Sequence, residues 1–296
     1  MSPTLRAAVW MIGAILSFSA MAVAGRMLAS GLDTFEIMLY RSILGIAIVL
    51  SVATMAGTLG QIRTDSLGLH LIRNISHFAG QNLWFYAIAL IPLAQVFALE
   101  FTSPIWALFL AVPVLGERLT AVRLLVALSG FGGILIITQP WQATLGPGVI
   151  AAALAALGFA GSAVFTRLLT RSSPITSILF WLVTMQALFA LIGAGFDGDI
   201  ALPLPPALPW LAVVSVGGLV AHLCLTKALA LAPAAVVVPI DFLRLPLVAM
   251  VGLVLFSEPL QPHVLAGAAV IFAANYLNIL AESRRNRAGP RAGRGG

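Results

Sequence analysis

The chain has 296 residues, of which 60% are hydrophobic and 9% are charged, and its mean hydropathy is +1.05. Soluble domains carry about 25% charged residues, so this composition excludes an ordinary water-facing surface and indicates a protein of the lipid bilayer. The net charge of +6 does not indicate nucleic-acid binding, because the basic residues lie at the ends of apolar segments. The single cysteine, Cys224, excludes an intrachain disulfide.

Ten apolar segments approach the length of about 20 residues that a helix needs to cross a bilayer. They are residues 7–25, 34–55, 70–91, 94–112, 119–138, 149–165, 174–195, 209–231, 235–255 and 262–281. The tail 283–296 is rich in Gly, Pro and Arg, has nothing to bury, and is expected to be disordered and cytoplasmic. The segments predict an all-α membrane protein of ten transmembrane helices.

The sequence repeats itself at an offset of 141 residues. Segment 94–117 carries Glu100 inside an apolar helix, and segment 235–258 carries Asp241 at the equivalent position. Further matches in the first and third helices include Phe18 with Phe159, Arg26 with Arg167, and Pro92 with Pro233. Because the first helix is part of the repeat, we do not expect it to be a removable signal peptide.

Each repeat contains five helices, and an odd number of helices means that the two repeats are inverted in the membrane. We predict a first repeat over 1–138, a linker over 139–148 and a second repeat over 149–282. With the N-terminus in the cytoplasm, nearly all basic residues lie on the cytoplasmic side, and Arg26 alone marks the outer face. This bias predicts a bacterial-type inner membrane with both termini cytoplasmic.

Two stretches resemble a known family. AIALIPLA, TSPIW and LGERLT, within residues 87–120, resemble the EamA domain of the drug/metabolite transporter superfamily. PIDFLRLP (239–246) and FSE (256–258) resemble the second EamA domain of its ten-helix members. The resemblance implies a transporter, and the family includes amino-acid exporters and carriers of riboflavin, S-adenosylmethionine or carboxylates. The second copy departs from the first: Arg244 replaces Ser103, and Leu182 stands at the position equivalent to Arg41.

Four charged residues lie inside predicted spans, where each is costly unless it is paired or functional. Arg41 and Glu100 lie roughly 10 Å from the outer face and could pair, while Arg244 follows Asp241 by three residues on one helix face. The four either form internal ion pairs that orient helices or line a cavity that meets substrate or protons. We expect Glu100 to be the coupling or gating acid and Asp241, held by Arg244, to be structural.

Other polar and aromatic residues could contact substrate or could simply pack between helices. The polar candidates are His77, Gln81, Asn82 and His222, and the aromatic ones are Tyr40, Trp84, Tyr86, Phe101 and Trp181. Glu117 and Glu258 end their segments, so we assign them to the helix that follows each. A nucleotide-binding loop, metal-ligand spacing and a nucleophile–base pair are all missing from the sequence. These features predict neither an enzyme nor an ATP-driven pump, and no cofactor or metal.

We predict a secondary active transporter of a small polar metabolite that works by alternating access between two inverted repeats. An amino acid or a related compound is the leading substrate class. The alternatives are a carrier of a flat cofactor or organic anion (riboflavin, S-adenosylmethionine or a carboxylate), a lipid-carrier flippase, and a non-transporting membrane scaffold. The expected partners are a small-molecule substrate, the lipid bilayer and protons as coupling ion. Nucleic acid is not expected, and the chain is predicted to be a monomer or a homodimer.

Overall fold

The computed structural model is all-helical over the residues that it describes, which are 3–116, 121–139, 145–196, 198–231, 240–241 and 243–287. Its helices are α1 (Pro3–Leu28), α2 (Thr34–Met55), α3 (Leu67–Leu90), α4 (Leu93–Glu100), α5 (Ser103–Leu115), α6 (Ala121–Thr138), α7 (Pro147–Leu169), α8 (Ile175–Ala194), α9 (Leu208–Leu231), α11 (Arg244–Phe256) and α12 (Pro262–Arg287). Short 3-10 turns occupy Leu59–Gln61 and Pro205–Ala207. The predicted all-α class is confirmed.

Six stretches are long and apolar enough to cross a membrane: Leu5–Leu28, Thr34–Met55, Leu93–Leu115, Pro147–Leu169, Ile175–Ala194 and Pro205–Leu225. Three shorter apolar stretches, Leu128–Thr138, Arg244–Phe256 and Pro262–Ala274, match three more of the predicted spans. The remaining predicted span is α3, which has 24 residues but carries many polar side chains. The helices are therefore consistent with ten spans, and α3 is the polar one among them.

The predicted helix 94–112 is two helices, α4 and α5, with a break between Glu100 and Ser103. Pro104 lies in the first turn of α5, where it has no N–H to donate and its ring would clash with the carbonyl four residues earlier. That carbonyl belongs to Glu100, and it accepts a hydrogen bond from the Ser103 hydroxyl at 2.5 Å. The sequence therefore breaks this helix beside its one buried acid.

The predicted disordered tail begins too early. Helix α12 continues to Arg287, five residues into that segment, and the rest of the tail lies outside the described residues. The helix is apolar up to Ala281 and turns polar after it, so the change in composition marks the end of the bilayer-facing part. It does not mark the end of the helix.

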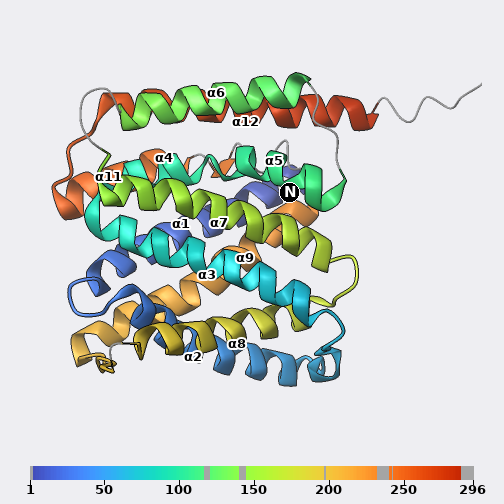
Figure 1. The fold of residues 1–296 in the computed structure, drawn as a ribbon, viewed down its shortest axis with the longest axis vertical. Helices are drawn as coiled ribbons and strands as arrows, with labels where there is room; N and C mark the ends of the chain where they lie inside the picture. Colours follow the sequence, from blue (N-terminus) through green and yellow to red (C-terminus); the bar gives the residue numbers. More distant parts are fainter. Residues whose placement is uncertain are drawn as a thin grey trace, which may run out of the picture.

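The helices pack in pairs, and each pair joins one helix of the first repeat to one helix of the second (Figure 1). Helices α6 and α12 form one edge of the bundle and α2 and α8 form the opposite edge, with the other helices between them. Helix α1 packs against α9, and α3 packs against α7. Since α7 repeats α1 and α9 repeats α3, these two pairings are the same contact made twice, as an inverted repeat requires.

Two equivalent glycines show this symmetry at the level of atoms. A Cβ on Gly158 of α7 would lie 2.8 Å from the Ser76 carbonyl oxygen of α3, and a Cβ on Gly217 of α9 would lie 3.3 Å from the Ser17 carbonyl oxygen of α1. Ser17 and Gly158 are equivalent at the repeat offset, and so are Ser76 and Gly217. Small residues let these helix backbones approach closely, as is usual in membrane bundles.

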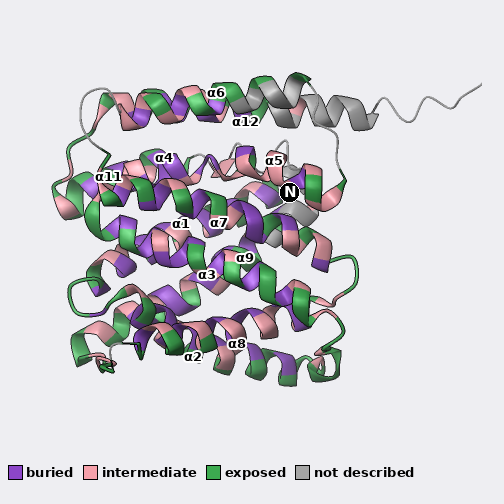
Figure 2. Cartoon of the chain, viewed as in Figure 1, coloured by how far each residue is buried: buried purple, intermediate pink, exposed green. Residues whose placement is uncertain are grey.

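Each helix has one buried side and one exposed side (Figure 2). Large apolar side chains such as Ile12, Leu16 and Leu223 are more than half exposed. A contiguous apolar exterior of this kind suits lipid rather than water. The polar residues discussed below are mostly on the buried sides.

We predict that Gly158→Ala lowers the stability of the folded protein by about 1–3 kcal/mol, because the added methyl would overlap α3. The new Cβ would lie 2.6 Å from the Gly80 Cα, and neither backbone can give way cheaply. The measurement is the thermal unfolding midpoint of purified protein in detergent. Gly132→Ala on α6 is the control, since nothing lies within 4 Å of its Cβ position. Equal midpoints for both variants would contradict the close crossing.

Candidate functional site

Helix α3 carries a buried polar face through the middle of the bundle. His70, Arg73, Asn74, His77 and Gln81 are all buried, and their spacing of three or four residues places them on one side of the helix. Polar and ionisable side chains inside a membrane span are rare and mark functional sites by default. This face is therefore the starting point for the candidate site.

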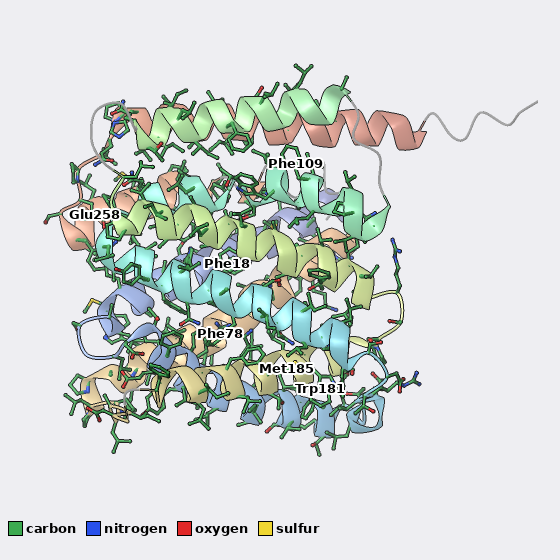
Figure 3. The ribbon with its side chains drawn as sticks, viewed as in Figure 1. Phe18, Phe78, Phe109, Trp181, Met185 and Glu258 are labelled. Atoms are coloured by element: carbon green, nitrogen blue, oxygen red, sulfur yellow. The ribbon has the colours of Figure 1, made fainter. Side chains whose placement is uncertain are left out.

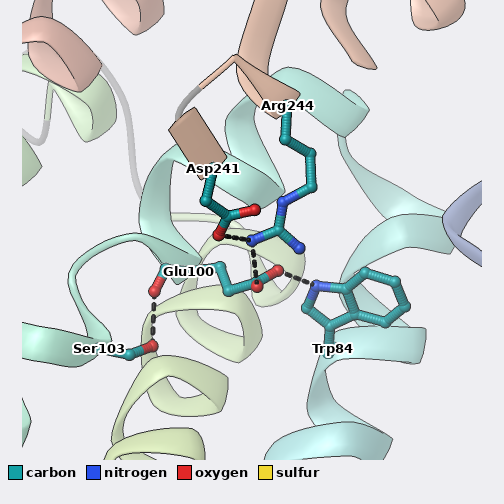
Figure 4. Close-up of polar contacts among 5 residues, drawn as sticks. All are labelled: Trp84, Glu100, Ser103, Asp241 and Arg244. Atoms are coloured by element: carbon teal, nitrogen blue, oxygen red, sulfur yellow. Dashed lines mark hydrogen bonds and ion pairs between the residues drawn. The ribbon is translucent and has the colours of Figure 1, made fainter. Parts of the chain in front are cut away.

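A three-residue ion cluster joins the two repeats (Figure 4). Arg244 Nη2, at the start of α11, lies 3.3 Å from Glu100 Oε1 of α4 and 3.1 Å from Asp241 Oδ2. Trp84 Nε1 of α3 donates to Glu100 Oε2 at 2.7 Å. The cluster supplies Arg244 with the counter-charge that a buried guanidinium requires, and it does so from both halves of the chain.

Three phenyl rings enclose the same guanidinium. The Cζ of Arg244 lies 4.8 Å from the ring centre of Phe18, 4.9 Å from that of Phe97 and 5.0 Å from that of Phe101. Aromatic faces attract a cation within about 6 Å, and more strongly when water is excluded. The aromatic candidate Phe101 is thus part of the arginine's surroundings, and so is Phe18, which was not among the site residues predicted from sequence.

The predicted pairing of Arg41 with Glu100 is wrong. Glu100 has two other partners, Arg244 and Trp84. The prediction used only the count of residues along each helix, and such a count does not say which side of the helix a residue faces. Arg244, from the other repeat, faces Glu100, and Arg41 does not.

Arg41 instead lies against α9. Its Nη1 donates to the Met38 sulfur at 3.4 Å, and its Nη2 lies 3.5 Å from the Cβ position of Gly218. One turn further along α9 is His222, whose ring meets that of Phe18 edge-on at 5.4 Å between centres. On α3, His77 Nδ1 lies 3.3 Å from Ser162 Oγ of α7.

The other polar candidates on α3 are also buried. Asn82 Nδ2 donates to the Phe78 carbonyl oxygen at 3.0 Å, within its own helix. Gln81 Oε1 and Asn82 Oδ1 have no hydrogen-bond partner among the described residues. Asn82 is next to Gln81 in sequence, so on a helix its side chain points about 100° away from the His77–Gln81 line.

Tyr86 lies apart from the other candidates. It is 44% exposed, and nine residues separate it from His77, which places it on the opposite side of α3. Its selection from sequence as a site residue is therefore not supported by its position. Trp84 is buried, and its indole is engaged by Glu100, so it orients the acid.

Tyr40 and Trp181 anchor loops at opposite ends of the bundle. The Tyr40 hydroxyl donates to the Ala201 carbonyl oxygen at 2.7 Å, and Trp181 Nε1 donates to the Arg63 carbonyl oxygen at 2.8 Å. These two residues are equivalent in the repeat, and so are their functions. From sequence we expected that they could stack on a substrate, whereas in the structure both donate a hydrogen bond to a loop backbone.

Sequence analysis missed a second contact between the repeats, at the end of the bundle where α1 ends. Glu258 forms an ion pair with Arg26 of α1 and accepts the Leu93 backbone N–H at the start of α4 at 2.9 Å (Figure 3). Arg26 also donates to the carbonyl oxygens of Ile88 and Ile91. The prediction that Glu258 serves the following helix is therefore wrong, since it caps a helix of the other repeat. Arg26 was the one basic residue that the sequence assigned to the outer face, and this exception could have indicated a partner for it there.

We name this contact between Arg26, Glu258 and the start of α4 the outer latch, after the face to which the distribution of basic residues in the sequence assigns it. At the repeat offset its equivalents are Arg167 and Glu117. Glu117 lies outside the described residues, so the structure leaves the second contact as a prediction from the repeat.

We predict that Arg244→Met destabilises the protein by about 3–5 kcal/mol, because it leaves two buried carboxylates without a counter-charge. Replacing both acids as well, in Arg244→Met with Glu100→Gln and Asp241→Asn, is expected to recover most of that loss. The measurement is the thermal unfolding midpoint, with exposed Arg171→Met as the control. A triple variant no more stable than the single one would contradict the ion cluster.

Comparison with known proteins identifies the family. A model of the EamA-like transporter family matches the chain twice, over residues 5–139 and 146–280. The chain is 29% identical over 286 residues to a riboflavin transporter of Brucella anthropi, covering 94% of this chain and 99% of that protein. It is 33% identical over 235 residues to a riboflavin transporter of Rhizobium johnstonii, covering 77% and 76%.

A more distant relative and a solved structure agree with this assignment. The chain is 26% identical to an S-adenosylmethionine uptake transporter of Rickettsia bellii, covering 93% of this chain and 94% of that one. A crystal structure superposes with a TM-score of 0.63 at 18% identity, covering 94% and 98%, which supports the fold alone. The chain therefore belongs to the EamA-like transporter family, as a multi-pass membrane protein that transports a small molecule and is not an enzyme.

Proposed function

We propose that this protein carries a flat heterocyclic cofactor of the riboflavin type across a bacterial inner membrane. The names of two of its relatives support this class, and none of the relatives described above supports the amino acid that the sequence analysis placed first. A flat cofactor was an alternative substrate class in the prediction from sequence, and it is the leading substrate class in this proposal.

One observation carries the proposal: the Phe18 ring lies between two groups suited to a flat, conjugated ligand. The Arg244 guanidinium lies 4.8 Å from the centre of the Phe18 ring, and the His222 ring meets the Phe18 ring edge-on at 5.4 Å between centres. Phe18 comes from the first repeat and the other two come from the second. Aromatic and guanidinium faces stack on planar rings, and nearby polar groups fix the orientation of such a ligand.

S-adenosylmethionine is a second candidate, favoured by the charge of the ion cluster. Glu100 and Asp241 share a single arginine, so the cluster carries one negative charge in excess when both are ionised. A sulfonium cation would neutralise that excess. The Rickettsia bellii relative, which is named an S-adenosylmethionine uptake transporter, supports this candidate.

We further propose that transport proceeds by alternating access, with the outer latch as one gate. The latch joins α1, the end of α3 and the start of α4 to Glu258 of the second repeat, so opening it would separate the repeats at that end. The equivalent Arg167 and Glu117 would form the gate at the other face. The distribution of basic residues supports cytoplasmic termini, which places the latch outside.

The substrate class is tested by flux into proteoliposomes of purified protein. We expect saturable uptake of riboflavin, competition by other flavins, and no competition by a panel of amino acids. S-adenosylmethionine is measured in the same vesicles, and uptake of it without riboflavin uptake would favour the second candidate. Uptake of amino acids alone would overturn the proposal. Empty vesicles and vesicles with the Arg244→Met protein are the controls.

The gate is tested by the access of a membrane-impermeant maleimide to Ala22→Cys in a Cys224→Ser background. Ala22 is buried on α1 between Phe18 and Arg26. We expect Glu258→Gln to raise the labelling rate from outside intact cells by about tenfold, because the buried ion pair is lost. Asp199→Asn, an exposed acid of the same predicted face, is the control. An unchanged rate would contradict the gate, and labelling only in inside-out vesicles would contradict the orientation.

A further inference from the structure

Two arginines lie inside the bundle without a carboxylate partner among the described residues. Arg73 is 8% exposed, and its Nε and Nη1 donate to Thr166 Oγ1 at 3.0 Å and Asn74 Oδ1 at 2.8 Å, both of them neutral groups. Arg41 donates to the Met38 sulfur, and its Nη2 lies near the Cβ position of Gly218. Arg244 differs from both, since two acids already neutralise it.

Helix geometry brings these arginines together with two histidines. Arg73, His77 and Gln81 follow one another at four-residue spacing along α3. Arg41 Nη2 of α2 lies 3.5 Å from the position that a Cβ on Gly218 of α9 would occupy, and Gly218 is one turn before His222. Helix α2, which carries Arg41, packs against both α3 and α9, the helices that carry the other three residues: Arg73, His77 and His222. We call these four residues the cationic subsite.

The cationic subsite also contains an unused hydrogen-bonding atom. His77 is 6% exposed, and its Nε2 has no partner among the described residues. A buried polar atom of this kind normally has a partner, and a buried charge needs a counter-charge. In the described part of the bundle, neither requirement is met by the protein itself.

We propose that the cationic subsite binds an anionic group of the carried molecule, either a phosphate or a carboxylate. This inference rests on the proposed function and narrows it to a flat heterocycle that bears an acidic substituent. The ring would lie against Phe18 and His222, and the acidic substituent would reach Arg41, Arg73 and His77. The fork of an arginine matches the oxygens of either group, and the ligand would provide the missing counter-charge.

The first test needs no knowledge of the heterocycle. Purified protein is heated with low-millimolar sodium phosphate, sodium acetate or sodium chloride at equal ionic strength. We expect phosphate or acetate to raise the unfolding midpoint in a saturable way above the midpoint measured in chloride. In Arg41→Gln we expect this rise to be lost. Exposed Arg171→Gln is the control and keeps the rise. No rise, or the same rise in Arg41→Gln, would overturn the subsite.

The second test compares riboflavin with riboflavin 5′-phosphate, which share one ring system and differ only in the phosphate. We expect the phosphate ester to bind the purified protein at least about tenfold more tightly than riboflavin, and Arg41→Gln to remove that preference. Equal affinities would overturn the subsite and leave the proposed function standing. Binding of neither flavin would overturn the proposed function, and the phosphate and acetate shifts would then decide the subsite.

Discussion

The neutralisation of Arg244 is the constraint on which the rest of the bundle depends. A guanidinium in the interior of a membrane protein is tolerable only beside acids and polarisable rings, and here these come from α1, α4 and Asp241, which lies three residues before α11 begins. At the break after Glu100, the backbone carbonyl of Glu100 accepts a hydrogen bond from the Ser103 hydroxyl. Trp84 of α3 donates a hydrogen bond to the Glu100 carboxylate. Arg244 is thus one of the residues through which the two repeats are fixed to each other.

Features that occur in both repeats and features that occur in only one repeat have different roles in this protein. The close crossings at Gly158 and Gly217, and the loop anchors Tyr40 and Trp181, occur in both halves and build the scaffold. Arg244 and Arg41 have no charged counterpart, since Ser103 and Leu182 stand at the equivalent positions. An inverted scaffold can expose the same centre to either face, whereas the asymmetric charges decide what binds there.

The helices and the repeat were predictable because periodic apolar runs and an unbroken offset of 141 residues are local features of the sequence. The contact between Arg244 and Asp241 was predictable for the same reason, since it lies within three residues. The partners of Glu100, Arg41 and Glu258 were not, because they depend on which side of each helix faces the other repeat. Tyr86 was also chosen without knowing which side of α3 it occupies, and it lies on the side opposite His77.

The most direct measurement of the central claim is a cryo-electron microscopy map of the protein with riboflavin bound. The account predicts density for the three-ring system between the repeats, in contact with Phe18 and His222, and on the side of Phe18 away from Phe97. Density for the ring at the lipid-facing surface, or between helices of a single repeat without contact to Phe18, would contradict it.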